Sequence, residues 1–136
     1  VMGMDSTESC FAEGPQIDAG LVGLDVGPRT REAYASEIRA ARTIFWNGPL
    51  GLCEVPPYDE GTRFLACAIA SSSAFSVVGG GDSIAAVNRL GIAPHFKHLS
   101  TGGGASLEFL AGVDLPGLQA LADAPSGPPR EAGRRR

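Results

Sequence analysis

The sequence predicts an α/β fold with parallel strands, and three observations support this prediction. Short β-branched and aromatic segments alternate with segments of helical periodicity three times along the chain. Glycine-rich loops follow each of these short segments directly. The 136 residues leave room for no more than one domain. A repeated strand–loop–helix order gives parallel strands joined by right-handed crossovers, so we expect helices layered on a parallel sheet.

The first half of the chain contains one predicted helix and one predicted buried strand. Residues 1–22 are expected to be irregular, with VMGMD at the start as a candidate short strand. Thr30 is the expected N-cap of a helix over 31–42. The apolar face of this helix contains Tyr34, Ile38 and Ala41. The next segment, 43–46, reads TIFW and predicts a buried strand that ends at the breaker Asn-Gly-Pro.

The second half repeats the pattern with shorter helices. Asp59 is the expected cap of a helix that runs to about residue 71, with a buried stripe formed by Phe64, Leu65, Ala68 and Ile69. Two further strands are predicted at 75–78 and 96–100. Three short helices complete the prediction: one opens at Asp82-Ser83 and ends at Leu90, one carries Leu107 and Leu110, and one runs from about Pro116 to Leu121. Residues 123–136 are rich in Pro, Gly and Arg and are expected to form a disordered tail.

The charge distribution argues against duplex nucleic acid as the main partner. Residues 1–124 carry a net charge of −7 and residues 125–136 a net charge of +3, which together give −4. Neutralising the phosphates of a duplex requires a basic face, which an acidic body does not supply. No apolar run approaches the roughly 18 residues of a membrane-spanning helix. We therefore expect neither a nucleic acid nor a membrane as partner.

The cysteines and histidines form no recognisable metal motif. Cys10, Cys53 and Cys67 have no zinc-site spacing and are expected to be small buried hydrophobic residues in a reducing compartment, the cytoplasm. His95 and His98 have no Cys, Asp or Glu neighbour at ligand spacing. A surface or packing role is therefore expected for both histidines.

The most informative segment is VVGGGDS at residues 77–83. Glycines between a strand and a helix let the backbone approach a ligand, and the helix N-terminus offers N–H groups and a positive dipole to an anion. Asp82 either caps the helix or holds Mg²⁺ beside phosphate groups, and the segment alone leaves both readings open. Ser83 could donate a hydrogen bond to a phosphate oxygen. The segment matches neither the Walker A pattern nor G-x-G-x-x-G.

Two more glycine-rich loops are expected at the same edge of the sheet. The segment STGGGAS at 100–106 repeats the strand–glycine–helix order, so the two loops form either a double anion cradle or two tight turns. The segment WNGPLGLCE at 46–54 also follows a strand. In it, Asn47 can bind a phosphate or the backbone, and Glu54 either accepts from ribose hydroxyls or is a solvated loop carboxylate. Together the loops predict a nucleotide site that lacks a basic catalytic residue, since Lys97 falls inside a predicted strand.

These segments resemble a known family. WNGPLGLCE, VVGGGDS and HLSTGGGASLEFLAG, with GLDVGP upstream, closely resemble the C-terminal part of phosphoglycerate kinases, in the same order over about residues 20–122. The resemblance implies a three-layer αβα architecture with a Rossmann-like parallel sheet. It further implies that residues 1–122 are an incomplete C-terminal, nucleotide-binding domain of a two-domain enzyme, followed by the tail 123–136. The start at Val1 rather than Met agrees with the expectation of a longer protein.

The resemblance also implies roles for individual residues. The reaction of the family is reversible phosphoryl transfer between 1,3-bisphosphoglycerate and ADP, giving 3-phosphoglycerate and ATP, with Mg²⁺. Carried over by motif, the nucleotide-binding residues would be Gly23 near the adenine, Asn47, Pro49 and Leu52 beside the nucleotide, Glu54 at the ribose, and Gly80, Gly81, Asp82 and Ser83 at the phosphates, with Asp82 as the metal ligand. Gly103 and Gly104 would lie where the phosphoryl group passes.

Other parts of the family pattern are missing from this chain. The Gly-Gly-Ala-Lys nucleotide loop, the substrate-binding arginines and histidines and a catalytic Arg or Lys have no counterpart, Ser83 replaces the more frequent Thr, and Cys53 replaces the usual Phe. One hypothesis is therefore a part of a phosphoglycerate kinase that acts, as a cytoplasmic monomer, only with an N-terminal substrate domain. The alternative is a non-catalytic nucleotide-binding module.

Overall fold

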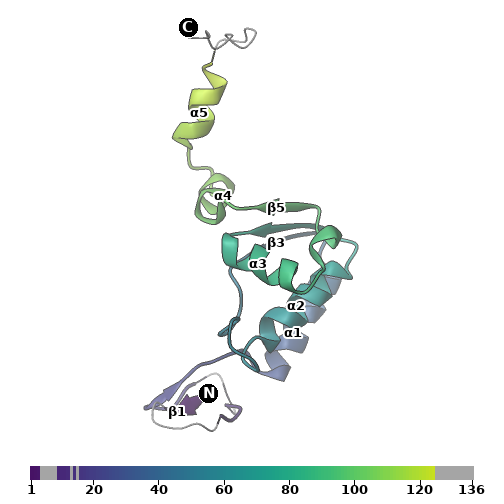
Figure 1. Cartoon of the computed structure of the whole chain (residues 1–136), viewed down its shortest axis with the longest axis vertical. Coiled ribbons are helices and arrows are strands. Elements are labelled where there is room, and N and C mark those ends of the chain that lie inside the picture. Colours follow the sequence, from purple (N-terminus) through teal and green to yellow (C-terminus); the bar gives the residue numbers. More distant parts are fainter. Residues whose placement is uncertain (4–8, 13, 15, 125–136) are drawn as a thin grey trace, which may run out of the picture. The chain divides into compact units, whose positions relative to one another are not determined.

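The computed structural model describes residues 1–3, 9–12, 14 and 16–124 and separates the chain into two compact units, Val1–Gly104 and Ala105–Arg136. The first unit contains the strands β1 (Met2–Gly3), β2 (Leu21–Val22), β3 (Thr43–Asn47), β4 (Phe75–Gly79) and β5 (His98–Ser100), and the helices α1 (Pro28–Ala40), α2 (Glu60–Ala70) and α3 (Gly81–Arg89). A short 3-10 helix, Ala93–His95, precedes β5. The helix α4 (Gly103–Leu110) begins at the end of this unit, and α5 (Pro116–Ala122) follows in the second unit (Figure 1).

The central sheet has the order β3-β4-β5, and both strand pairs are parallel. The register pairs Asn47 with Gly79 and Gly79 with Ser100, so the carboxyl ends of the three strands coincide. This arrangement confirms the predicted α/β class and places the three glycine-rich loops at one edge of the sheet. β1 and β2 form a separate antiparallel pair, which the sequence indicated only at residues 1–5.

The core lies between the sheet and the helices α1–α3. Its buried side chains are Ile38, Trp46, Leu65, Ala66, Ile69, Val78, Val87 and Phe96. Trp46 and Val78 point from the same face of the sheet, because they are paired in the parallel register. The ring centroids of Trp46 and Phe96 are 6.5 Å apart, a distance typical of a favourable aromatic pair.

Two predicted helix starts are corrected by the structure. α1 begins at Pro28 with Gly27 as its N-cap, so Thr30 lies within the first turn and is not the cap. Proline at the first helical position has the φ that a helix needs and loses no intrahelical hydrogen bond there. α3 begins at Gly81 with Gly80 as its N-cap, so Asp82 is a first-turn residue and the capping interpretation of Asp82 is wrong. By contrast, Asp59 is at the N-cap position of α2 as predicted, although its side chain makes no capping hydrogen bond.

In α1 and α2 the predicted buried face is confirmed in part: Ile38, Leu65 and Ile69 are buried as expected, but the buried face is rotated toward residues that were not predicted. α1 buries Ala35 and Ile38, while Tyr34 is 44% exposed. In α2, Thr62, Leu65, Ala66 and Ile69 form the buried stripe, and Cys67 is exposed on the other side. Phe64 and Ala68 are only partly buried. Cys10 is also exposed, so the expectation of three buried cysteines holds only for Cys53.

The last strand and the C-terminal segment also differ in part from the sequence-based prediction. β5 covers His98–Ser100 and is shorter than the predicted 96–100. Phe96 and Lys97 precede the strand, Phe96 as a core residue and Lys97 as an exposed one. α5 begins at Pro116 as predicted, and none of the residues of α4 or α5 is buried. The disorder predicted for 123–136 falls almost entirely on residues 125–136, which lie outside the described residues. Within the described residues, no helix has the length and apolar character needed to cross a membrane.

Candidate nucleotide site

Asn47 lies where the three glycine-rich loops meet. Its Oδ1 would be 2.7 Å from a Cβ built on Gly79, 3.3 Å from one on Gly80 and 2.8 Å from one on Gly103. None of these three positions has room for a side chain without movement of the amide. The sequence placed all three loops at one edge of the sheet, and the structure brings two of them into contact with Asn47.

The loops that follow β4 and β5 also touch one another. A Cβ on Gly103 would lie 2.9 Å from the Cα of Gly80 and 3.1 Å from its nitrogen. The N–H of Gly80 donates to the carbonyl oxygen of Ser100 over 2.9 Å, which ties the start of α3 to the end of β5. Gly80 has a φ of +88°, a conformation that glycine adopts without strain. The two helix starts therefore lie side by side.

The first turn of α3 is exposed and suited to an anion. Gly80, the N-cap, has no side chain to satisfy the free N–H groups of this turn. Gly81 and Asp82 are both exposed. Backbone N–H groups and the positive end of the helix dipole favour a phosphate at such a position.

Asp82 is suited to a shared magnesium ion. It is an exposed carboxylate in the first turn of α3, next to the N–H groups described above. Mg²⁺ is commonly bound by one or two carboxylates together with the phosphates of a nucleotide and several waters. The described residues contain no group of three or more His, Cys, Asp or Glu side chains that could hold a metal alone. The donor set therefore fits a magnesium ion that arrives with a nucleotide.

Ser83 has a structural contact that the sequence did not indicate. Its side chain is fully buried, and its Oγ accepts a hydrogen bond from the N–H of Gly48 over 2.8 Å. The hydroxyl therefore holds the start of the loop that follows β3. Its predicted contact with a phosphate stays a prediction.

The loop from Gly48 to Tyr58 is fixed at several further points. The Thr62 hydroxyl bonds both the N–H and the carbonyl oxygen of Leu50, each over 2.7 Å. The guanidinium of Arg89, at the other end of α3, donates to the carbonyl oxygen of Cys53 over 3.0 Å. Sequence reasoning missed Thr62 and Arg89, because neither belongs to a glycine-rich segment. The loop is thus held by α2 and by both ends of α3.

The residues expected at the base and sugar form a second group. The N–H of Leu52 donates to the carbonyl oxygen of Leu24 over 2.9 Å, which places the 48–58 loop beside the segment that contains Gly23. Leu52 and Glu54 are exposed, and Pro49 is half-buried. Gly104 is exposed in the first turn of α4. The loop therefore connects the group near Asn47 to the group near Gly23.

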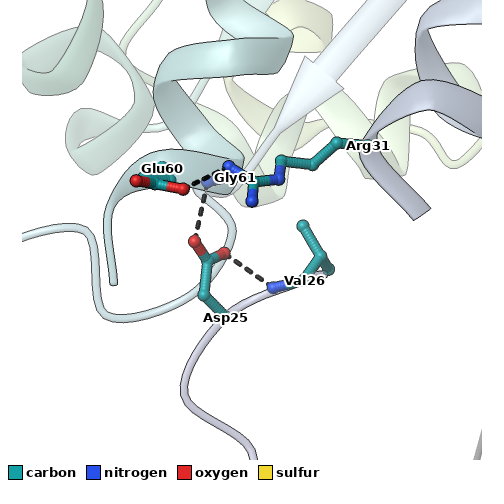
Figure 2. Close-up of polar contacts among 5 residues, drawn as sticks. All are labelled: Asp25, Val26, Arg31, Glu60 and Gly61. Carbon is teal, nitrogen blue, oxygen red and sulfur yellow. Dashed lines mark hydrogen bonds and ion pairs between the residues drawn. The ribbon is translucent and has the colours of Figure 1, made fainter. Parts of the chain in front are cut away.

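Asp25 joins this second group to α2. One of its carboxylate oxygens accepts from the N–H of Val26, and the other accepts from the N–H of Gly61, each over 2.7 Å (Figure 2). Beside it, Arg31 of α1 forms an ion pair with Glu60 of α2 at 2.6 Å. Sequence reasoning named Asp25 only as part of the GLDVGP segment and predicted no role for it.

The thiol of Cys53 lies buried in the same loop. Burial raises the pKa of Cys53, and the carboxylate of Glu54 raises it further, while Arg89 acts in the opposite direction. Cys53 is therefore a protonated packing residue at neutral pH.

The hollows on the surface do not coincide with the glycine loops. One of about 390 Å³ runs along the free edge of β3 and is lined mainly by apolar side chains, with Asn47 and Gly48 at one end. Another, of about 590 Å³, lies between α1 and α2. The glycine loops form an open backbone surface at the sheet edge. The case for a nucleotide site there therefore depends on the close approach of the backbones and on the helix starts.

Comparison with known proteins decides the family. The family model described as phosphoglycerate kinase matches residues 3–113. The chain belongs to the phosphoglycerate kinase family. It is 63% identical over 106 residues to the phosphoglycerate kinase of Thermus thermophilus, covering 77% of this chain and 27% of that protein. It is 58% identical over 110 residues to that of Renibacterium salmoninarum, covering 80% and 26%.

Solved phosphoglycerate kinases share its fold. The enzyme from Coxiella burnetii superimposes with a TM-score of 0.66 at 47% identity, covering 72% of this chain and 25% of that chain. The enzyme from Pyrococcus horikoshii gives 0.67 at 48% identity, covering 73% and 24%. The predicted αβα, Rossmann-like class and the resemblance are both confirmed. The chain spans about a quarter of the length of the phosphoglycerate kinases it matches.

Proposed function

We propose that this chain binds Mg-ADP and Mg-ATP at the carboxyl edge of its parallel sheet. The observation that carries the proposal is the meeting of Gly80 and Gly103 at Asn47, beside the exposed first turn of α3. The glycines let phosphate oxygens approach the backbone N–H groups, and Asp82 supplies the carboxylate for magnesium. Mg²⁺ would neutralise phosphate charge when it is bound.

The nucleotide would extend along the loop from Asn47 toward Gly23. In this placement the phosphates lie at the glycine loops, Glu54 accepts from the ribose hydroxyls, and Leu52 and Gly23 border the base. The hydrogen bond between Leu52 and Leu24 supports this placement, because it keeps the sugar and base residues together. Pro49 lies in the loop between the two groups.

The proposed reaction is that of the family. A β-phosphate oxygen of ADP attacks the acyl phosphate of 1,3-bisphosphoglycerate, the bond from phosphorus to the acyl oxygen breaks, and 3-phosphoglycerate leaves as ATP forms. Gly103 and Gly104 would line the path of the phosphoryl group. The bisphosphoglycerate and the cationic groups that stabilise the transferred charge would be supplied by an N-terminal domain. We propose a monomeric, cytoplasmic glycolytic enzyme as the functional form, without a nucleic acid or membrane partner.

Calorimetric titration of the 136-residue chain with Mg-ADP tests the nucleotide site. The expected result is saturable binding at one site that weakens when magnesium is removed. The test variant is Asn47→Asp, which keeps the size of the side chain but places a negative charge among the glycine loops. It should weaken Mg-ADP binding by about tenfold or more. A chain that is folded by circular dichroism but gives no saturable heat would overturn the proposal.

A further inference from the structure

The carboxylate of Asp25 lies between its own segment, the 48–58 loop and the start of α2, which follows that loop in the chain. It accepts from Val26 in its own segment and from Gly61 in the first turn of α2 (Figure 2). A Cβ on Gly51, in the 48–58 loop, would lie 2.5 Å from its Oδ1 and 2.7 Å from its Cγ. Gly51 also has a φ of +65°. The loop therefore approaches the carboxylate as closely as a glycine permits.

The neighbouring residue strengthens the same connection. Leu24 is buried, and its carbonyl oxygen accepts from the N–H of Leu52. Leu24 thus binds the 48–58 loop through its backbone carbonyl, and the adjacent Asp25 binds α2 through its side chain. Gly23, the residue expected at the adenine, comes immediately before them.

We propose that Asp25 is a positioning residue for the adenosine half of the nucleotide, an inference that rests on the proposed nucleotide site. It sets the distance between the segment that contains Gly23 and the loop that contains Leu52 and Glu54. The phosphate half of the site, at Asn47, Gly80 and Gly103, is held by the sheet register and by Ser83 and does not depend on Asp25.

A carboxylate suits this position better than an amide. Both oxygens of Asp25 accept hydrogen bonds, whereas an asparagine of the same size has one acceptor and would turn an N–H group toward one of the two donors. Leaving a part-buried backbone N–H without its acceptor costs more than the average hydrogen bond contributes. The carboxylate also lies at the N-terminus of α2, where the helix dipole favours a negative charge.

The test compares Asp25→Asn with Glu60→Gln in the 136-residue chain. Glu60 precedes Gly61 in the first turn of α2, and Glu60→Gln removes its ion pair with Arg31 of α1 while leaving the Asp25 contacts in place. Two ligands are titrated, Mg-ADP and Mg-pyrophosphate, of which only the first has an adenosine half. Backbone hydrogen exchange of the 48–58 loop is measured without ligand.

Asp25→Asn is expected to weaken Mg-ADP binding by about tenfold and to leave Mg-pyrophosphate binding within about twofold. Exchange at the Leu52 amide should rise at least about fivefold, and Glu60→Gln should change none of these values by more than about twofold. Equal weakening of both ligands would mean a general structural role and would overturn the proposal. Unchanged Mg-ADP affinity, or unchanged exchange at Leu52, would also overturn it.

Two further outcomes are separated by the design. If the wild-type chain does not bind Mg-ADP, whether or not it binds Mg-pyrophosphate, the proposed nucleotide site is overturned, and the adenosine role of Asp25 is overturned with it. If Asp25→Asn does not fold, Asp25→Ser leaves a small acceptor beside Val26 while releasing Gly61, and the same comparison of two ligands decides. A folded serine variant with full selectivity for Mg-ADP would overturn the proposal.

Discussion

Gly103 and Gly80 approach so closely that a Cβ on Gly103 would lie 2.9 Å from the Cα of Gly80. This contact joins the loop after β4 to the loop after β5 at a point where Asn47 closes the third side. The two helix starts can approach this closely because Gly103 lacks a side chain. The contact is therefore a condition for the proposed phosphate site, and it can be tested by adding one methyl group.

Gly103→Ala is expected to destabilise the chain by about 1–3 kcal/mol, because the methyl group would overlap the Gly80 backbone and the Asn47 amide. Gly104→Ala is the matched control for stability, since a Cβ there meets no atom within 4 Å. Alanine at that helical position should leave stability unchanged or raise it by up to about 1 kcal/mol. Urea denaturation of both variants provides the comparison, and equal stability of the two would show that the loops separate easily.

Asp82→Asn is expected to remove the magnesium dependence of nucleotide binding. The residue is exposed and is not the cap of α3, so the loss of its charge should cost at most about 1 kcal/mol of folding stability. The affinity for ADP in the presence of magnesium should fall at least about tenfold. Asp59→Asn, at the start of α2, is the control variant at a helix start without a proposed ligand. A magnesium titration that is the same for wild type and Asp82→Asn would contradict the metal role.

Glu54→Ala is expected to weaken ADP binding about 10- to 100-fold, because it removes a charge-assisted hydrogen bond to the ribose. The same substitution should leave the affinity for 2′,3′-dideoxy-ADP unchanged, because this ligand lacks both hydroxyls. Calorimetry with the two ligands gives the ratio of affinities. Wild type should prefer ADP, and a variant that retains the wild-type preference would show that Glu54 does not read the sugar.

The stability of the chain is expected to fall at alkaline pH through Cys53. Burial and Glu54 raise the pKa of the folded thiol, so the unfolded chain loses its proton at a lower pH than the folded chain does. The free energy of unfolding should therefore decrease as pH rises above the ordinary thiol pKa and level off above the raised one. Denaturation of Cys53→Ala should lack this component, and Cys67→Ala, an exposed control, should keep it.

The 136-residue chain alone is expected to be inactive in the formation of ATP from 1,3-bisphosphoglycerate. Phosphoryl transfer requires cationic groups around the transferred charge and an aligned acceptor, whereas the residues proposed here for the phosphates supply backbone N–H groups, the Asn47 amide and the Asp82 carboxylate. Addition of the remaining part of the Thermus thermophilus relative as a separate polypeptide should give measurable activity. Full activity of the chain alone would show that the catalytic groups lie within it. Absence of activity after the two polypeptides are mixed would favour a non-catalytic nucleotide-binding module.

Local sequence predicted the elements well where short-range forces decide them. The three central strands, the helix that starts after Asp59 and the start of α5 at Pro116 follow from apolar periodicity, helix-capping residues and proline geometry. The helix faces were less predictable. Tyr34 and Cys67 have apolar neighbours at helical spacing, but only the packing of α1 and α2 decides which side of each helix is buried.

The sequence by itself determined the parallel sheet, the edge at which its glycine-rich loops lie and the family resemblance, because strand character, glycine and residue order are properties of adjacent residues. Only the tertiary structure decided what holds those loops. Asp25 binds Gly61 and Arg89 binds Cys53, each across 36 residues, and Ser83 binds Gly48 across 35. No local pattern specifies such pairs, because each one depends on how two helices and a loop pack together around a shared core.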